Sequence, residues 1–243
     1  MINGPMQVVA DSFQHAWLDV VNQLESAHWE LNNVVAHIRN ITAMDQGFHS
    51  DMESFAEDQA ILGPKHVAYT IFPHGLYRGK DAEGVFEAYN RPGGFYDRKK
   101  TRWGTYFRRM TSYKVKNERV NQLKNIIDAI RDRETLNKAA YTVTLQYPGK
   151  ETIRKMGGPC LNYLAIQAKP ARGNSPMTLG LMAVYRNHDF LQRAYGNYWG
   201  LCNLIGFLAR EVGGRPGPLT CVSSHAYVSE KKTALRSLKE VLS

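Results

Sequence analysis

The sequence predicts an α+β fold in a single domain that covers residues 1–243. Some segments place apolar residues at helical spacing, whereas others alternate apolar and polar residues or form short apolar runs, as strands do. The two kinds of segment follow one another without strict β-α-β order, which favours α+β over a doubly wound sheet. A chain of 243 residues with 43% hydrophobic and 22% charged residues can bury a core of ordinary size, which excludes a disordered or fibrous protein.

The first half of the chain predicts two helices, one strand and a long loop. A stripe of apolar residues marks the first helix, and its members are Phe13, Trp17, Val20, Val21 and Leu24. Residues 33–41 predict a strand, and residues 51–62 predict a second helix that stops at Gly63-Pro64. Residues 80–100 are rich in Gly, Asp, Asn and aromatic residues, which predicts an irregular and partly mobile loop.

The second half predicts two helices with strong apolar period, several strands and a short terminal helix. The first of these helices is marked by Val120, Leu123, Ile126, Ile127 and Ile130. Strands are expected at 141–147, 161–168 and 178–186. The next helix ends near Gly213-Gly214, and its apolar face is formed by Tyr198, Leu201, Leu204, Ile205 and Leu208. A last strand at 219–227 and a helix at 233–241 complete the prediction.

The charge balance suits an anionic partner. Lysine and arginine outnumber the acids by 31 to 22, which gives a net charge of +9 and favours nucleic acid or a small phosphate-bearing ligand. The densest basic cluster lies at 98–109 and is interleaved with aromatic residues. This cluster fits an RNA groove, a phosphate pocket or simply a solvated basic face.

Membrane, secretory and metal-binding classes find no support in the sequence. The longest apolar runs, such as 179–185, are too short to span a bilayer, and the first residues lack the layout of a signal peptide. We therefore expect a cytoplasmic protein. The three cysteines are an odd number without a C-x-x-C pair, which argues against a disulfide framework or a zinc site and leaves a cysteine free as a working thiol.

Three short motifs in the C-terminal half contain residues suited to catalysis. Cys160 follows Gly158-Pro159, Asn197 lies eight residues after Asp189, and residues 223–227 read Ser-Ser-His-Ala-Tyr. Each residue alone has an ordinary structural explanation. Cys160 could be a small buried residue, Asn197 a helix cap, and the histidine a member of a strand.

Taken together and in this order, the motifs resemble the thymidylate synthase family. That family has P-P-C-H, then Q-R-S-x-D, then Asn eight residues after that Asp, then H-x-Y. The counterparts here are Pro159-Cys160, Arg186 with Asp189, Asn197, and His225 with Tyr227. Weaker similarities lie upstream, where residues 103–108 resemble Y-G-x-Q-W-R and residues 121–123 resemble D-Q-L. The resemblance covers residues 100–228 well and the first hundred only in outline.

The resemblance implies a fold, an assembly and a covalent mechanism. The fold would be a mixed sheet packed with helices, with one sheet face forming a homodimer interface. Cys160 would add to C6 of a pyrimidine ring, because a thiolate both adds well and leaves again. Arg186 would bind the nucleotide phosphate and favour the thiolate. The carbon donor would be 5,10-methylenetetrahydrofolate, and no metal is implied.

The other matched positions would bind the two substrates. Asn197 would recognise the N3/O4 edge of the base, since an amide offers one donor and one acceptor. His225 and Tyr227 would hold the sugar 3′-hydroxyl, and Asp189 would contact the folate pterin. Trp103 replaces the tyrosine of the family's Y-G and would contact the nucleotide.

Two further roles are assigned by the same resemblance. A carboxylate is needed for proton traffic around C4 and C5, and Glu53 is the first choice, with Glu57 one helical turn away as the reserve. The arginines that reach the partner's phosphate in the family fall on Asn137 and Lys138, so Lys138 would be the cation that crosses the dimer.

Several matched positions depart from the family pattern. The histidine after the catalytic cysteine is Leu161, and the serine after the phosphate arginine is Asn187. Only 18 residues follow His225, whereas the thymidylate synthases run longer and close their tail over the folate. These departures favour the pyrimidine nucleotide hydroxymethylases of the family, in which water captures the methylene intermediate.

The expected activity is therefore folate-dependent C5 hydroxymethylation of CMP, dCMP or a uridylate, by a one-carbon transferase. A divergent thymidylate synthase that methylates dUMP is the alternative within the family. A basic nucleic-acid-binding protein, or a nucleotide-binding protein without catalysis, is the alternative of another class. The phage dCMP enzyme has Asp where this chain has Asn197, so the choice between cytosine and uracil stays open, as does the sugar.

Overall fold

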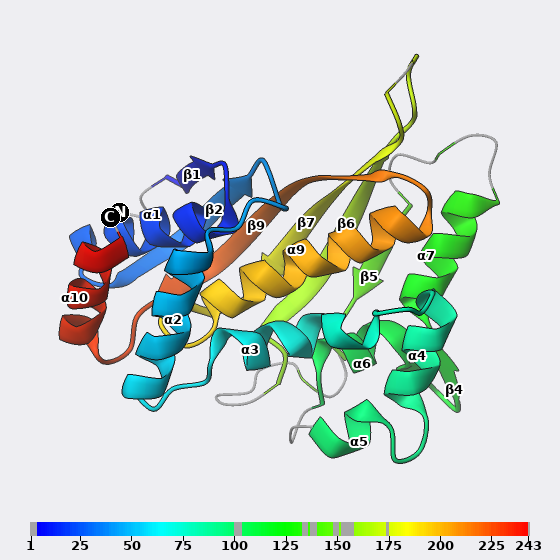
Figure 1. Ribbon diagram of the computed structural model, residues 1–243, viewed down its shortest axis with the longest axis horizontal. Coiled ribbons are helices and arrows are strands. Elements are labelled where there is room, and N and C mark those ends of the chain that lie inside the picture. Colours follow the sequence, from blue (N-terminus) through cyan, green and yellow to red (C-terminus); the bar gives the residue numbers. More distant parts are fainter. Residues whose placement is uncertain are drawn as a thin grey trace.

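A mixed β-sheet forms the centre of the protein (Figure 1). The structure is a computed structural model that describes residues 4–99, 104–132, 136, 140–147, 151, 158–173 and 175–242. Within these residues the main sheet has seven strands in the order β1-β2-β9-β7-β6-β5, with β8 beside β9. The strands are β1 (Met6–Ala10), β2 (Glu30–Ile38), β5 (Thr142–Thr144), β6 (Leu161–Lys169), β7 (Thr178–Tyr185), β8 (His188–Asp189) and β9 (Arg215–Tyr227).

The sheet mixes parallel and antiparallel pairs, which confirms the predicted α+β class. β1 pairs parallel with β2, and β9 pairs parallel with β7 and β8. The pairs β2–β9, β6–β7 and β5–β6 are antiparallel. This register brings the end of β7 next to the last part of β9, where the motif residues of both strands lie.

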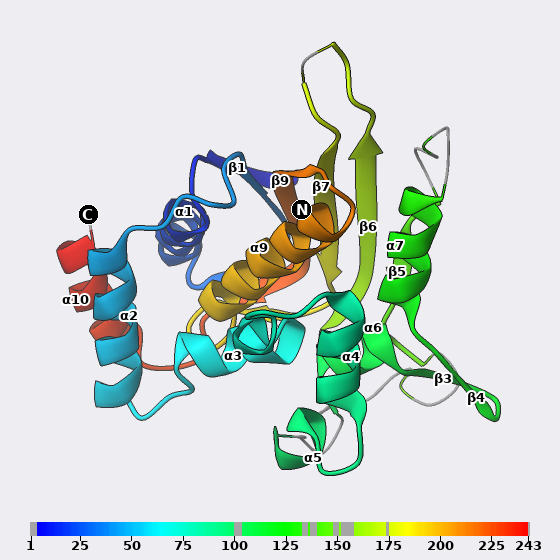
Figure 2. The same ribbon diagram turned by 45° about the vertical axis from the view of Figure 1, so that its right-hand side comes forward.

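Helices α1 and α9 pack on the sheet, and α3 crosses the outer side of α9 (Figures 1 and 2). A small hairpin, β3 (Tyr113–Val115) and β4 (Glu118–Val120), follows α6. The helices are α1 (Phe13–Ser26), α2 (Gln46–Asp58), α3 (Pro64–Ile71), η1 (His74–Leu76), α4 (Ala82–Asn90), α5 (Phe95–Lys99), α6 (Tyr106–Thr111), α7 (Gln122–Arg131), α9 (Ala194–Glu211) and α10 (Lys232–Leu242). Among the residues that the structure describes, no helix combines the length and apolar character needed to cross a membrane.

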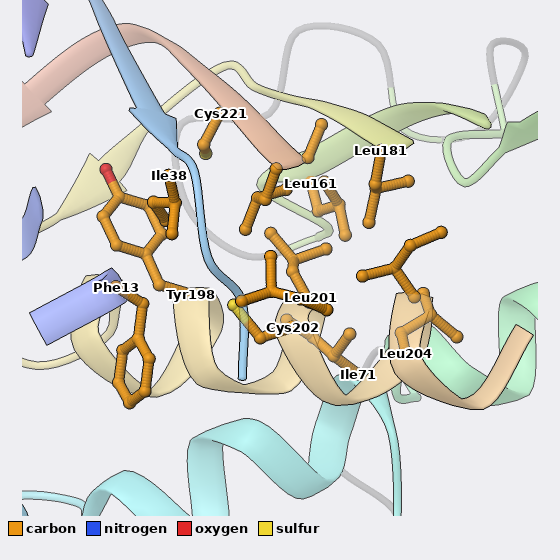
Figure 3. Close-up of a cluster of buried hydrophobic side chains, with 14 of the residues drawn as sticks. Phe13, Ile38, Ile71, Leu161, Leu181, Tyr198, Leu201, Cys202, Leu204 and Cys221 are labelled. Carbon is orange, nitrogen blue, oxygen red and sulfur yellow. The ribbon is translucent and has the colours of Figure 1, made fainter. Parts of the chain in front are cut away.

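The core lies between α9 and the sheet (Figure 3). Tyr198, Leu201 and Leu204 on α9 face Leu161 and Leu181 of the central strands, and all five are buried. Burying a leucine side chain stabilises a fold by roughly 1.5–3 kcal/mol. The same stripe that predicted the helix therefore anchors it to the sheet.

Two glycines on α9 allow α3 to pack against it at short range. A Cβ added at Gly196 would lie 2.6 Å from Cβ of Val67, and one added at Gly200 would lie 2.8 Å from the carbonyl oxygen of Ala68. Separations this short would force the two helices apart. Because these two positions have no side chain, α3 can lie close to α9, and Val67 and Thr70 of α3 reach the cavity described below.

The segments with the strongest period are confirmed. They are helices α1, α7, α9 and α10 and strands β6 and β7. Boundaries differ elsewhere: the strand predicted at 33–41 is Glu30–Ile38, and the helix predicted at 51–62 is Gln46–Asp58, which begins after Asp45 as its N-cap. The strand predicted at 141–147 is only Thr142–Thr144, and the last strand begins at Arg215 rather than 219.

The prediction of an irregular loop at 80–100 is wrong. Helices α4 and α5 occupy most of this segment. The side chain of Asp81 accepts a hydrogen bond from the backbone N–H of Gly84 at 2.9 Å and so caps α4. Val85, Phe86 and Tyr89 are buried on one face of that helix. The glycines and polar residues of this segment obscured a helical stripe that only packing makes evident.

Two arginines of the basic cluster at 98–109 serve the fold. Arg108 donates to the side chain of Asn90 at 2.6 Å and lies over the ring of Tyr96. Arg109 is buried and forms an ion pair with Glu151 at 2.6 Å. These internal contacts engage both guanidinium groups, so this part of the basic cluster stabilises the fold.

Candidate active site

Five of the predicted site residues line one cavity of about 490 Å³. They are Cys160, Arg186, Asp189, Asn197 and Tyr227. The cavity lies where β6, β7, β8 and β9 meet the beginning of α9, and α3 and α6 complete its wall. Residues up to 67 positions apart in the sequence, from 160 to 227, thus meet around one space because the sheet register aligns their strands.

Cys160 is held by its own backbone just before β6. Its N–H donates to the hydroxyl of Tyr106 at 3.1 Å, and its carbonyl accepts from the N–H of Arg186 at 2.9 Å. The turn before it uses Gly158 at φ +92°, a conformation that L side chains rarely adopt. The thiol is therefore placed in the cavity by fixed backbone contacts.

Two effects shift the pKa of the Cys160 thiol in opposite directions. Burial raises the pKa of its thiol, whereas Arg186 and Arg193 lower it. The net pKa is above the ordinary value, so the predicted cation is present but does not outweigh desolvation. Cys202 and Cys221 are fully buried, and burial raises their pKa values well above the ordinary range. Cys160 is thus the cysteine best placed to react.

Arg186 lies exposed at the end of β7 and faces the cavity. Its Nε donates to the carbonyl oxygen of Pro159 at 3.1 Å. That contact ties the guanidinium to the turn that bears Cys160.

Asp189 sits on β8 with part of its hydrogen-bonding capacity already used. One carboxylate oxygen accepts the N–H groups of Leu191 and Gln192, at 3.0 and 3.1 Å. Burial raises the pKa of Asp189, and these two N–H groups act in the opposite direction. Of the described residues that line the cavity, Asp189 is the only carboxylate.

Asn197 is buried in the second turn of α9. The residue that precedes this helix is Arg193, so the alternative that Asn197 is a helix cap is wrong. Its Nδ2 lies 3.1 Å from Nε2 of His188, while the residue itself lines the cavity.

His225 and Tyr227 stack on each other, with ring centroids 5.2 Å apart. Tyr227 lines the cavity, but His225 does not. The ring of His225 is engaged by Asn187 Oδ1 at 2.5 Å and by Glu30 Oε1 at 2.9 Å. The structure thus places His225 behind Tyr227, where it supports the cavity wall.

The structure does not bring the predicted carboxylate to the cavity. Glu53 accepts the N–H of Lys65 at 3.0 Å and lies 3.7 Å from Nε2 of His49, and it is not among the cavity residues. Glu57 is exposed on α2. Trp103 and Lys138 lie outside the described residues.

A second, largely apolar cavity of about 390 Å³ adjoins the first. The two share Thr70 and Arg193, and the second is walled by the rings of Tyr69, Tyr89 and Phe95. Arg193 therefore lies between a polar cavity that contains the thiol and an aromatic cavity beside it.

Sequence reasoning missed three residues of this site. Tyr106 holds the backbone of Cys160, Arg193 contributes the second cation, and His188 contacts Asn197. Tyr106 and His188 both lie inside quoted motifs, so attention to every position of those motifs would have found them. Arg193 had no sequence signal, because its position depends on how α9 begins. Among the described residues, no group of three His, Cys, Asp or Glu side chains is arranged to hold a metal.

Three curated relatives share weak similarity with this chain. They are proteins named "Putative thymidylate synthase" from Methanosarcina acetivorans, Methanosarcina mazei and Methanosarcina barkeri. The identities are 27%, 27% and 25% over 124 residues, which cover 51% of this chain and 52% of each relative. These relatives support a thymidylate synthase-like assignment. No known family profile matches the chain.

The similarity agrees with the fold but is limited in extent. The mixed sheet packed by helices is consistent with a thymidylate synthase-like fold. Because the matched stretch spans about half the length of the relatives, their activity is not transferred to this chain by similarity alone.

Proposed function

We propose that this protein transfers a one-carbon unit from a folate to C5 of a pyrimidine nucleoside monophosphate. The observation that supports the proposal best is the convergence of Cys160, Arg186, Asp189 and Asn197 on one cavity. A nucleophile, a cation, a carboxylate and an amide are the groups that this chemistry requires. The names of the three relatives point to the same class of reaction.

Cys160 begins the reaction as a thiolate that adds to C6 of the base. The new S–C bond pushes an electron pair to C5, which then attacks an electrophilic one-carbon unit. The proton at C5 leaves before the thiolate is expelled, so the cysteine is regenerated. Arg186 and Arg193 favour the thiolate, and Tyr106 fixes the backbone from which it attacks.

The remaining cavity residues hold the nucleotide. Arg186 is exposed at the rim and suits the 5′-phosphate, since a guanidinium binds phosphate oxygens through paired hydrogen bonds. Asn197 offers one donor and one acceptor to the base edge. Tyr227 faces the sugar, and His225 stacks behind it.

The aromatic cavity beside the thiol suits the folate. Methylenetetrahydrofolate supplies the one-carbon unit when it is bound, and its extended aromatic shape fits walls formed by Tyr69, Tyr89 and Phe95. Asp189 lines the first cavity and its carbonyl accepts the N–H of the shared Arg193 at 3.1 Å, so it would contact the pterin from that side. Arg193, which both cavities share, lies close enough to act on either ligand.

We further propose that the product is hydroxymethylated. Hydride delivery needs a site that excludes water. Here the wall next to Asp189 consists of the exposed Arg193 and the half-buried Gln192, both of which are polar. The bond between the transferred carbon and the folate nitrogen would break and tetrahydrofolate would leave, which gives a methylene group at C5. Water held by these side chains would add to that methylene group, and expulsion of the Cys160 thiolate would release the hydroxymethylated product.

The test is a panel of dUMP, UMP, dCMP and CMP, each incubated with methylenetetrahydrofolate. A hydroxymethylase yields a product heavier by CH2O without any rise in dihydrofolate absorbance, and its new oxygen comes from labelled water. A methylated product with a dihydrofolate signal would instead support a divergent thymidylate synthase. If the nucleotide gains no mass in any of the four reactions, the proposed activity is wrong.

We also propose a homodimer formed through the sheet. Along β6, β7 and β9, half-buried side chains on one face of the sheet alternate with buried side chains on the other. The half-buried, largely apolar side chains include Tyr163, Met182, Val184 and Val222. Such a row of apolar side chains suits a second copy of the same face. Lys138 would then cross from one subunit to the phosphate bound by the other.

Mixed dimers test this assembly. The variants Cys160→Ala and Lys138→Ala should each be nearly inactive, but a mixture should regain activity because one of the two sites in a mixed dimer is intact. A monomer by light scattering would contradict the proposal.

A further inference from the structure

Two successive hydrogen bonds connect Ser223 on β9 to Asn197 through His188. Nδ2 of Asn197 lies 3.1 Å from Nε2 of His188, and Nδ1 of His188 lies 2.8 Å from the hydroxyl oxygen of Ser223. His188 is 1% exposed, Asn197 4% and Ser223 0%. Among the described residues, His188 is the side chain that hydrogen-bonds the amide of Asn197, so this contact bears on which end of the amide faces the cavity.

The imidazole of His188 is confined and neutral. The ring of Tyr185 stacks on it with centroids 4.0 Å apart and an angle of 5° between the planes. The ring centroids of Phe190 and Tyr198 lie 5.1 and 5.7 Å from that of His188. Complete burial lowers the pKa of His188 to about 3. At neutral pH the ring therefore has one donor nitrogen and one acceptor nitrogen, and it cannot turn without displacing its aromatic neighbours.

The direction of the hydrogen bonds follows from these contacts. An amide nitrogen only donates, so Nε2 of His188 accepts from Asn197 and the ring proton lies on Nδ1. Nδ1–H then donates to Ser223. The opposite tautomer would require the amide to turn over and present its nitrogen to the cavity instead of its oxygen. The tautomer of His188 and the orientation of the Asn197 amide therefore change together.

The orientation of the amide matters because uracil and cytosine differ in the order of their groups. Uracil offers N3–H as a donor and O4 as an acceptor, whereas cytosine offers N3 as an acceptor and the 4-amino group as a donor. A freely turning amide accepts either base, but a locked amide fits one order only. A good paired contact to a base edge discriminates by about 1–3 kcal/mol, which corresponds to roughly 5- to 150-fold in affinity.

We propose that His188, held by Ser223, is a positioning residue that locks the amide of Asn197 and so determines whether the enzyme selects uracil or cytosine. The inference rests on the proposed function, because it assumes that Asn197 faces the base. It assigns the choice of base to a residue of the cavity wall that acts through Asn197.

The first experiment measures binding of dUMP and dCMP by calorimetry, with deoxyribose 5-phosphate as a probe without a base. The wild-type protein should prefer one nucleotide by at least tenfold. His188→Phe keeps an aromatic ring but loses both hydrogen bonds, and should reduce the preference to within about threefold while leaving the base-free probe unchanged. The matched control is His15→Phe, since His15 bonds Ser12 at the same 2.8 Å but lies on α1 outside the cavity. This control should retain the full preference.

The second experiment distinguishes positioning from a structural role. Ser223→Ala leaves Nδ1 without its acceptor, which should favour the Nε2–H tautomer, turn the amide over and shift the preference toward the other base. Nitrogen-15 NMR of labelled histidine should show a directly bonded proton on Nδ1 of His188 in the wild type and on Nε2 in this variant. His188→Gln, which retains a donor and an acceptor, should recover part of the preference.

Two outcomes would overturn the inference while the proposed function stands. One is a full base preference in folded His188→Phe, and the other is a wild-type ring with its proton on Nε2. If the wild type binds deoxyribose 5-phosphate but gains no affinity from either base, Asn197 does not face the base and the inference fails. If it binds none of the three compounds, the proposed function fails together with the inference.

Discussion

The cavity has two kinds of wall, and they differ in how directly the sequence determines them. Strands β6 to β9 and the start of α9 contribute the wall that contains Cys160, Arg186 and Asn197. Helices α3 and α6 contribute the opposite wall, with Val67, Thr70 and Tyr106. Residues of the first wall are aligned by backbone hydrogen bonds of the sheet, whereas those of the second depend on how side chains pack.

The two walls also differ in the roles that we propose for their residues. The wall from the sheet holds the groups that we propose to react or bind. The wall from the helices holds those groups in place, through the hydroxyl of Tyr106 on Cys160 and the close packing of α3 on α9. Changes in the first wall should therefore affect turnover and binding, and changes in the second should affect stability.

The largest expected effect is the loss of the nucleophile. Cys160→Ala should lower turnover by at least about 1,000-fold, because loss of a covalent nucleophile removes the whole mechanism, while nucleotide binding stays largely intact. Cys202→Ala is the control, since this thiol is buried in the core and should not affect the chemistry directly. Steady-state kinetics and binding measured on the same preparations provide the check. Normal turnover by Cys160→Ala would contradict the mechanism.

Removing the cation at the rim should weaken phosphate binding. Hydrogen bonds to charged groups contribute about 1.5–3 kcal/mol, so Arg186→Ala should weaken binding of the monophosphate by roughly 10- to 100-fold and leave the nucleoside unaffected. Arg39→Ala, which removes a surface arginine paired with Asp11, is the control. Equal losses for nucleotide and nucleoside would show that Arg186 does not meet the phosphate.

Two glycines of α9 test how closely α3 packs against this helix. Gly200→Ala places a Cβ 2.8 Å from the backbone of Ala68 and should destabilise the fold by about 1–3 kcal/mol. Gly206→Ala meets nothing within 4 Å and should stabilise it by about 0.4–1 kcal/mol. Thermal denaturation of both variants measures the difference. Equal stabilities would mean that α3 is not seated closely on α9.

The smallest effect concerns the reactivity of the thiol with pH. Because the pKa of Cys160 is raised, its thiolate fraction at neutral pH is small and increases as pH rises toward that pKa, so the rate of alkylation should climb with pH. Arg193→Gln removes a cation that lowers this pKa, and should move the climb to higher pH and slow alkylation several-fold at a fixed pH. Arg193→Lys keeps the charge and should retain the wild-type profile. An unchanged profile for Arg193→Gln would show that its charge does not reach the sulfur.

Much of the candidate site followed from the order of residues along the chain. Cys160, Arg186, Asp189, Asn197 and Tyr227 were all expected from motifs, and the structure places them around one cavity. Their convergence was predictable because each motif falls at the end of a strand or the beginning of a helix. Backbone pairing then brings such ends together.

Other features could not be derived from motif spacing. Glu53 was selected from its place on a helix, but its distance from the cavity depends on how α2 lies against α3, where it accepts the N–H of Lys65. His225 was expected to face the sugar, but it lies behind Tyr227 because Asn187 and Glu30 engage its ring. Both outcomes are decided by contacts between distant segments.

The sequence by itself determined the α+β class and the helices and strands with strong apolar period, and it singled out Cys160 as the proposed nucleophile. These follow from local rules, since period selects the element and residue type selects the chemistry. Only the tertiary structure decided that residues 82–90 form a helix, that Arg193 lines two adjoining cavities, and that His188 lies within hydrogen-bond distance of Asn197. The physical reason is that burial, the pairing of polar groups and the balance of charge around a thiol arise from atoms far apart in the chain, and no local pattern encodes their distances.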